Sequence, residues 1–192
     1  MQTFLATIEG TTSLLQHRFG ESAEGSVAKS TRRVVMESST PRAEAEKVEY
    51  KAEDGTYYMP GAAFSRLLRE AGGGHKLKGS RKSAKYVVPS AVLIMDDRVT
   101  LLDVTNKPLK KYEVDSRPVV IPATKGRVMR HRPRHDSWRA KVLIRVNDQL
   151  LSSAFVHQLL VEGGQQIGVG DFRPEKGGPF GTFAVVEWTE TN

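Results

Sequence analysis

The chain has 192 residues, 39% of them hydrophobic, which is enough to bury the core of one domain. It contains no cysteine, so disulfides, thiol nucleophiles and thiolate-bound zinc are excluded. No apolar run is long enough to cross a bilayer, and the first ten residues lack the pattern of a secretion signal, so we expect a cytoplasmic protein without membrane contact.

The formal net charge is +7, and the basic residues are concentrated in two stretches. Residues 107–145 hold twelve lysines and arginines against three acidic residues, and residues 76–85 hold five against none. Such clusters suit a phosphate backbone, because binding neutralises phosphates and releases their counterions. The alternative interpretation is solvated surface charge that keeps the protein soluble.

The first part of the chain predicts two strands and one helix around a long insertion. Residues 3–8 place Phe4, Ala6 and Ile8 on one face, as in a strand. Residues 20–54 lack apolar periodicity and predict a partly disordered insertion with a short helix near residues 42–48. Residues 56–59 predict a short strand. Apolar residues at helical spacing then predict a helix from Gly61 that ends at Gly72–Gly74.

The second part of the chain predicts mainly strands. Residues 85–95 are apolar and β-branched with a proline interruption, which predicts a broken or edge strand. We expect Asn147–Asp148 to cap a helix with an apolar face over residues 150–161, and Gly163–Gly164 to end it. Further strands are predicted over residues 99–104, 114–121, 140–146 and 182–188.

This order of elements predicts an α+β, ferredoxin-like (RRM-like) fold, in which a β-α-β-β-α-β chain forms an antiparallel sheet with both helices on one face. We expect a single domain over residues 1–192 with insertions at 20–54 and 96–139, and an arginine-rich stretch at residues 125–139 that could protrude as an arm. The sheet face that the helices leave open is a common platform for RNA.

Two motifs stand out from this framework. Residues 59–71, MPGAAFSRLLREA, combine a Pro-Gly turn with a basic helix, and residues 167–185, IGVGDFRPEKGGPFGTFAV, form a glycine-rich loop that leads into the last strand. Together they resemble the RAMP superfamily of CRISPR systems, which includes the backbone subunits that coat guide RNA and related repeat-processing endoribonucleases. The first motif departs from the family at Ser65, where lysine is frequent, and at Ala62 and Ala63, where serines are usual.

The resemblance implies that both motifs contact RNA. A helix that begins at Gly61 presents unpaired N–H groups and a positive dipole end, both favourable for a phosphate. The loop over residues 168–181 would bring backbone amides and Arg173 against a sugar-phosphate strand, or it would only close one edge of the sheet. It is not a nucleoside-triphosphate loop, because no Gly-Lys-Ser/Thr follows it.

The candidate RNA-binding residues come from the first helix, the two basic stretches and the glycine-rich loop. Trp138 is included because an indole can stack on a base, with core packing as the equal alternative. No catalytic residue, metal site or cofactor is predicted, since the histidines, including His131 and His135, have no partner fixed by spacing. The candidates are Arg66, Arg69, Lys76, Lys78, Arg81, Lys82, Arg127, Arg130, Arg132, Arg134, Trp138, Gly168, Gly170 and Arg173.

We therefore expect a non-catalytic RNA-binding backbone subunit of a CRISPR ribonucleoprotein effector complex. The resemblance implies that it polymerises along guide RNA as a helical filament of its own copies, beside other effector subunits, and holds the guide for pairing with a target nucleic acid. Two alternatives remain open. One is a metal-independent RAMP-type endoribonuclease that processes repeat RNA, and the other is a single-stranded nucleic-acid-binding protein outside any CRISPR system.

Overall fold

A computed structural model describes residues 1–19, 40–77, 79–120 and 125–191. Lys78, most of the predicted insertion at 20–54 and the end of the predicted strand at Ile121 therefore lie outside the described residues. Within the described part of the chain, no helix is both long and apolar enough to cross a membrane.

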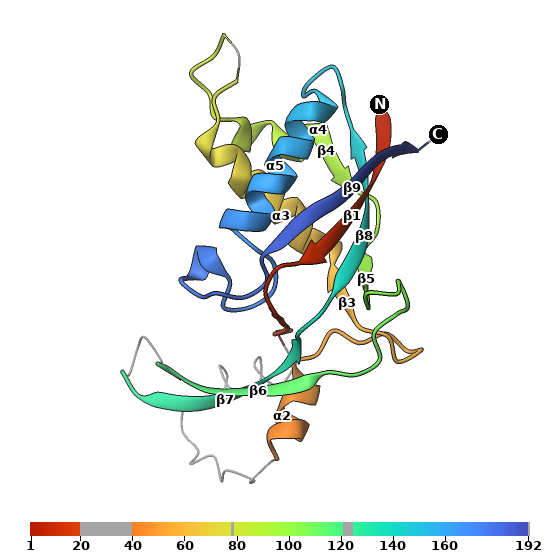
Figure 1. Cartoon of the computed structure of the whole chain (residues 1–192). Coiled ribbons are helices and arrows are strands. Elements are labelled where there is room, and N and C mark those ends of the chain that lie inside the picture. Colours follow the sequence, from red (N-terminus) through yellow and green to blue (C-terminus); the bar gives the residue numbers. More distant parts are fainter. Residues whose placement is uncertain (20–39, 78, 121–124, 192) are drawn as a thin grey trace.

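The larger of two sheets is antiparallel and carries helices on one face (Figure 1). Its strand order is β3-β5-β8-β1-β9, with β4 also paired to β8. The helices α3 and α5 pack against each other on that face. The elements are β1 (Gln2–Gly10), β3 (Tyr58–Pro60), α3 (Gly61–Ala71), β4 (Val92–Ile94), β5 (Arg98–Leu102), β8 (Arg139–Val146), α5 (Ser153–Gln166) and β9 (Phe183–Thr191).

The predicted ferredoxin-like fold is confirmed by this topology. The chain runs through β1, α3, a strand beside β8, then β8, α5 and β9, and places β9 and β8 on either side of β1. The strand beside β8 is divided in two. β4 pairs with β8 at Ile144–Val146, whereas β5 pairs with it at Arg139 and Ala140, so together they occupy one position in the sheet.

A smaller sheet lies at one end of the larger one and is built on a long hairpin (Figure 1). The hairpin consists of β6 (Glu113–Val120) and β7 (Arg127–His135), and the short strand β2 (Leu14–Leu15) adds to the edge of β7. A short helix, α2 (Pro41–Lys47), packs against β7 near the position predicted for it. The arginine-rich stretch is thus one arm of a hairpin.

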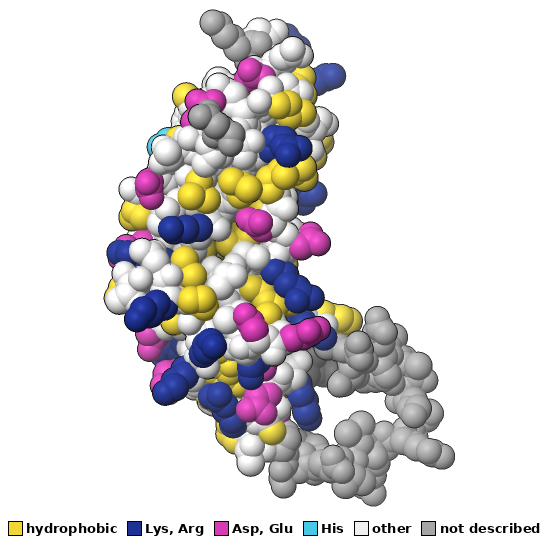
Figure 2. Space-filling model, turned by 90° about the vertical axis from the view of Figure 1, so that its right-hand side faces the viewer, with side chains coloured by type: hydrophobic (Ala, Val, Ile, Leu, Met, Phe, Trp, Pro, Cys, Tyr) yellow, Lys and Arg dark blue, Asp and Glu magenta, His cyan; other side chains and the backbone are white. Residues whose placement is uncertain are grey.

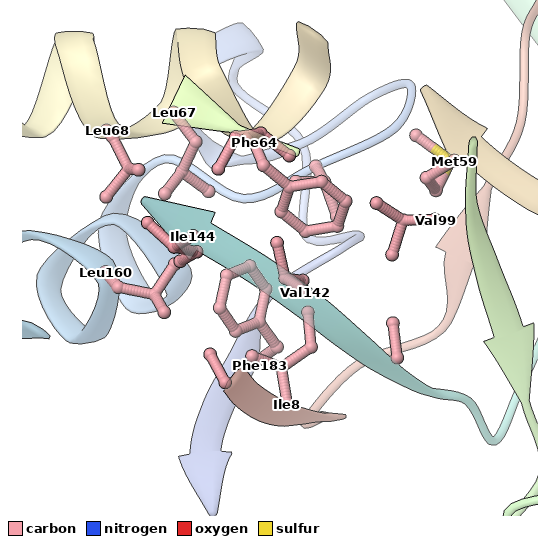
Figure 3. Packing of buried hydrophobic residues seen from close by; sticks show 14 of the residues in the cluster. Ile8, Met59, Phe64, Leu67, Leu68, Val99, Val142, Ile144, Leu160 and Phe183 are labelled. Atoms are coloured by element: carbon pink, nitrogen blue, oxygen red, sulfur yellow. The ribbon is translucent and has the colours of Figure 1, made fainter. Parts of the chain in front are cut away.

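The main core lies between the larger sheet and its two helices (Figure 3). Alternate residues of β1 and β8 point into it, including Ile8, Val142 and Ile144, as the period of a strand requires. Phe64 and Leu67 of α3 meet them from the helix side, and their helical spacing is the one that the sequence predicted.

The predicted broken strand at residues 85–95 is wrong over its first half. Residues Ala84–Tyr86 form a 3₁₀ turn and Val88–Ala91 form the short helix α4, before β4 begins at Val92. Ser83 caps this segment by accepting a hydrogen bond from the Lys85 backbone N–H, and Pro89 lies in the first turn of α4, where its missing N–H costs nothing. Local capping therefore overrides the β-branched composition.

The predicted ends of α5 are also wrong. The helix begins at Ser153, where the Ser152 side chain accepts a hydrogen bond from the Phe155 N–H, so Asn147–Asp148 is not its cap. Gly163 and Gly164 lie inside the helix, which continues to Gln166. A Cβ atom on Gly163 would lie 2.4 Å from Leu67 Cδ2, so here glycine allows α3 and α5 to approach closely and does not end the helix.

Candidate nucleic-acid interface

The two motifs singled out in the sequence meet at one cavity of about 360 Å³. Met59 and Pro60 at the end of β3 and the first turns of α3, up to Arg66, form one wall, and the loop after α5, from Val169 to Arg173, forms another. His17 and Tyr50 complete the lining from segments that lie before and after α2. Residues more than a hundred positions apart in the chain therefore surround a single space.

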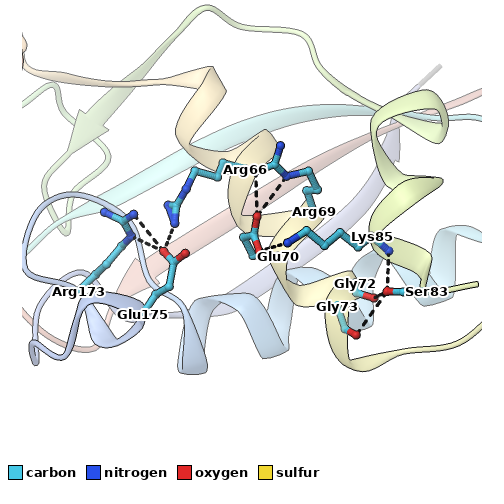
Figure 4. A network of polar contacts seen from close by, with 9 residues as sticks. All are labelled: Arg66, Arg69, Glu70, Gly72, Gly73, Ser83, Lys85, Arg173 and Glu175. Atoms are coloured by element: carbon cyan, nitrogen blue, oxygen red, sulfur yellow. Dashed lines mark hydrogen bonds and ion pairs between the residues drawn. The ribbon is translucent and has the colours of Figure 1, made fainter.

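Two arginines from different elements converge at this cavity (Figure 4). Arg66 of α3 forms an ion pair with Glu175, and Arg173 Nη2 lies 3.0 Å from the same carboxylate oxygen, Oε2. Arg173 also donates from Nη1 to the carbonyl oxygen of Gly170, at 2.6 Å. Burial, followed by the nearby Arg66 cation, lowers the pKa of Arg173. The site therefore holds two cations close together in a partly buried place.

The Pro-Gly turn at the start of α3 has a packing reason of its own. A Cβ atom on Gly61 would lie 2.0 Å from the backbone oxygen of Asp96, and the Gly61 N–H donates to the Asp97 carbonyl at 2.8 Å. No side chain caps the helix, since Pro60 is its N-cap residue. Ala62 and Ala63 follow at the cavity wall, where the dipole of α3 favours an anion.

The glycine-rich loop is shaped by left-handed backbone and by contact with β2. Gly168 and Gly170 have φ values of 72° and 79°, which other residues rarely adopt. A Cβ atom on Gly170 would lie 2.4 Å from the Leu15 carbonyl oxygen, and the Asp171 N–H donates to that oxygen at 2.8 Å. Gly170 therefore lies directly against the smaller sheet, whereas Gly168 packs against other parts of the loop, so the direct structural role of both glycines is packing.

A second ion pair joins the loop to the hairpin. Asp171 Oδ2 lies 2.9 Å from Arg132 Nε, and the Arg132 side chain is only 4% exposed. The expectation that Arg132 faces RNA is therefore wrong for this conformation, because its guanidinium is buried against the loop. His17 accepts a hydrogen bond from Arg130 at 3.3 Å, and burial lowers the pKa of His17, so the ring is neutral near pH 7.

The remaining hairpin arginines are more accessible than Arg132. Arg127 and Arg130 are exposed on β7, with Arg130 beside the cavity through its contact with His17. Arg134 is half-buried and pairs with Asp136 at 2.5 Å. The hairpin therefore continues the positive charge of the cavity along its outer part.

The described residues of the second basic stretch are not part of this site. Lys76, Arg81 and Lys82 are exposed on a loop beyond the C-terminal end of α3, whereas the cavity lies at its N-terminal end. The eleven residues of α3 separate the two places by about 16 Å. Arg69 lies between them on α3 and pairs with Glu70 at 2.8 Å (Figure 4).

Trp138 belongs to the core, so the expectation that it stacks on a base is wrong. Its side chain is 1% exposed, packs edge-on against Phe183 and donates from Nε1 to the Thr12 carbonyl at 2.9 Å. His135 is buried as well, and burial lowers its pKa to about 4. His131 Nδ1 lies 2.7 Å from the Ser116 hydroxyl on the neighbouring strand.

The sequence pointed to the open face of the larger sheet as a platform for RNA, but the central strands of this face offer no ring on which a base could stack. These two strands present Leu5 and Thr7 from β1, and Lys141, Leu143 and Arg145 from β8, without an aromatic ring. On this side of the molecule, Figure 2 shows basic, acidic and hydrophobic side chains intermixed, with no continuous basic tract among the described residues. The cavity is the better candidate site.

Sequence reasoning missed Tyr50, which lines the cavity. It also missed the carboxylates that pair with the arginines, namely Asp171 and Glu175. A signal for two of them was available, since Asp171 and Glu175 flank Arg173 in the loop. Among the described residues, no group of three His, Asp or Glu side chains is arranged to hold a metal ion.

Comparison with known proteins adds information on the fold. No family model and no curated protein matches the sequence. A crystal structure of Cmr6 from Pyrococcus furiosus is similar over 95% of this chain and 97% of that chain, with 11% identity and a TM-score of 0.46. A chain in the cryo-EM structure of the type III-B Cmr-beta bound to cognate target RNA is similar over 100% of this chain, with 12% identity and a TM-score of 0.52.

This chain spans 61% of the length of that Cmr-beta chain. At such low identity the likeness shows a shared fold and nothing further.

Proposed function

We propose that this protein is an RNA-binding backbone subunit of a CRISPR ribonucleoprotein effector complex. The observation that carries the proposal is the cavity at which the RAMP-like motifs of residues 59–71 and 167–185 meet, with Arg66 and Arg173 in its walls. In this proposal the cavity and the exposed arginines of the hairpin hold the sugar-phosphate backbone of the guide. The protein itself performs no cleavage and uses no cofactor.

The fold supports this assignment. The Cmr-beta structure is bound to cognate target RNA, and the similar chain in it matches the whole of this protein with 61% of its own length. By analogy, the partners of this protein would be guide RNA, a target nucleic acid paired with it, further copies of the chain and other effector subunits. Contacts to phosphates position a strand without reading its sequence, so base pairing would supply the specificity.

The experiment replaces two accessible hairpin arginines, Arg127→Gln together with Arg130→Gln, and measures affinity for single-stranded RNA by fluorescence anisotropy over a series of salt concentrations. Loss of two phosphate contacts should reduce the slope of log K against log salt by about 1.4 and should weaken binding alike for unrelated sequences. Arg132 is left unchanged, because it is buried and its replacement would disturb the fold.

The matched control is Lys141→Gln with Arg145→Gln, which removes the same charge from the open face of the larger sheet. We expect the control to retain the salt slope of the wild-type protein. An equal loss in both double variants would mean that only net charge matters, and a greater loss in the control would move the site to the open sheet face.

A further inference from the structure

The arginines of the cavity already bind an anion that belongs to the chain itself. Arg66 pairs with Glu175, and Arg173 contacts the same Glu175 oxygen twice, with Nε and Nη2 both 3.0 Å from Oε2 (Figure 4). Two guanidinium groups from separate elements therefore share one oxygen of one carboxylate. Each guanidinium is built to bind an oxyanion through two parallel N–H groups.

A phosphodiester could take the place of the carboxylate between these donors. A phosphodiester carries two non-bridging oxygens at a tetrahedral centre, so each arginine could take an oxygen of its own. The Arg173 side chain is 14% exposed, and without Glu175 this largely buried cation would lose the carboxylate with which it forms an ion pair. The site therefore requires a negative group, and Glu175 supplies one in the structure.

Glu175 is placed so that it can leave. It lies in the short 3₁₀ turn η3 (Pro174–Lys176), its side chain is 28% exposed, and the turn ends at Gly177 in left-handed conformation with open space around it. Asp171, the other carboxylate at the cavity, is held differently. Its backbone N–H is bonded to Leu15 and its side chain is paired with the buried Arg132, so it is part of the framework.

We propose that the Glu175 carboxylate occupies the position of an RNA phosphate in the free protein and that a phosphodiester displaces it from Arg66 and Arg173 when RNA binds. This inference rests on the proposed function. It adds that the cavity recognises a phosphodiester and that Glu175 competes with it. The competition lowers the affinity of the cavity for anions that bind non-specifically, because a ligand must replace an ion pair that already exists.

The test is Glu175→Gln, which keeps the shape of the side chain and removes its charge. We expect it to bind single-stranded RNA about fivefold more tightly than the wild-type protein, which corresponds to the upper end of the range for one partly exposed ion pair. The control is Glu190→Gln, which makes the same charge change at an exposed position on β9. A gain in Glu175→Gln no larger than in the control would overturn the proposal.

Two further arms identify the source of the phosphate and the residues involved. RNA with a 5′-hydroxyl and RNA with a 5′-phosphate are compared. If Glu175→Gln increases the affinity for both RNAs equally, the site binds an internal phosphodiester. If it increases the affinity only for the 5′-phosphorylated RNA, the site binds a terminal phosphate and the assignment to an internal phosphodiester is wrong. In an Arg66→Gln background, the gain from Glu175→Gln should disappear, and its persistence would contradict the exchange.

A measurement without RNA separates this proposal from the proposed function. Inorganic phosphate should raise the melting temperature of Glu175→Gln more than that of the wild-type protein or of Glu190→Gln. If no variant binds RNA but phosphate still stabilises Glu175→Gln selectively, the proposed function fails and the anion exchange stands. If RNA binds with normal affinity and phosphate has no selective effect, the exchange fails and the proposed function stands.

Discussion

Several glycines of this chain are required because a neighbouring backbone lies against them. A Cβ atom on Gly164 would lie 2.6 Å from the backbone oxygen of Phe183, and one on Gly181 would lie 1.8 Å from that of Val169. A backbone oxygen cannot move aside as the end of a side chain can. Gly164 therefore sets how closely α5 approaches the last strand, and Gly181 sets how closely the two ends of the glycine-rich loop approach each other beside Val169, which lines the cavity.

At the residue scale, we predict that Gly164→Ala destabilises the protein by about 1–3 kcal/mol, although alanine is the better helix former. The added methyl group would press on the backbone and ring of Phe183 and would force α5 away from β9. Urea unfolding, followed by the fluorescence of the buried Trp138, measures the change.

The control is Gly73→Ala, where a Cβ atom meets nothing within 4 Å. Its effect should stay within about 0.5 kcal/mol. Equal stabilities for the Gly164 variant and the wild-type protein would show that α5 and β9 have room to separate.

At the scale of elements, the loop between α5 and β9 links the two sheets. Val169 contributes to the main core, and Asp171 pairs with Arg132 of the hairpin. Arg117 of β6 lies over the ring of Phe180, with its guanidinium carbon 4.6 Å from the ring centroid. The loop therefore sets the position of the hairpin relative to the larger sheet, in addition to lining the cavity.

We predict that Asp171→Asn destabilises the protein by about 2–3 kcal/mol, because the Arg132 guanidinium would remain buried without its anion. This value is smaller than that for a fully buried pair, since the Asp171 carboxylate is 30% exposed. Thermal unfolding at neutral pH measures the effect.

The double variant Arg132→Met, Asp171→Asn should recover much of this loss, because no uncompensated charge is left in the interior. Asp136→Asn is the matched control, since that carboxylate pairs with Arg134 at an exposed position. Additive losses in the double variant would argue that the two side chains stabilise the fold independently.

At the scale of the whole molecule, the cavity lies where the larger sheet meets the hairpin sheet. Its lining comes from α3, from the loop after α5, and from segments before and after α2. The hairpin projects away from the helix-covered sheet (Figure 1) and carries exposed Arg127 and Arg130. An RNA strand bound in the cavity and along the hairpin would extend beyond one copy of the protein and could contact the next copy.

The proposed backbone role then predicts how many copies bind. On single-stranded RNAs of increasing length, native mass spectrometry should detect complexes whose number of protein copies rises in whole steps with RNA length. A hairpin variant with Arg127→Gln and Arg130→Gln should need higher protein concentrations for each step. One copy per RNA at every length would rule out assembly along a guide and would favour a protein that binds a single site.

The sequence by itself determined the fold class and most of the elements. The alternation of apolar residues in residues 3–8 and their helical spacing in residues 61–71 are local patterns. Because a sheet and a helix must each bury an apolar face, these patterns lead to helices packed on one face of the sheet. Local patterns also misled where a cap or a close contact outweighed composition, as at residues 85–91 and at Gly163.

Only the tertiary structure decided which cationic side chains are available. Arg130 and Arg132 are two residues apart on β7, yet Arg130 is exposed and Arg132 is buried against Asp171. Likewise, Arg66 and Arg173 share Glu175 although more than a hundred residues separate them. The energy of a charge depends on its burial and on its nearest opposite charge, and both are set by contacts between distant parts of the chain.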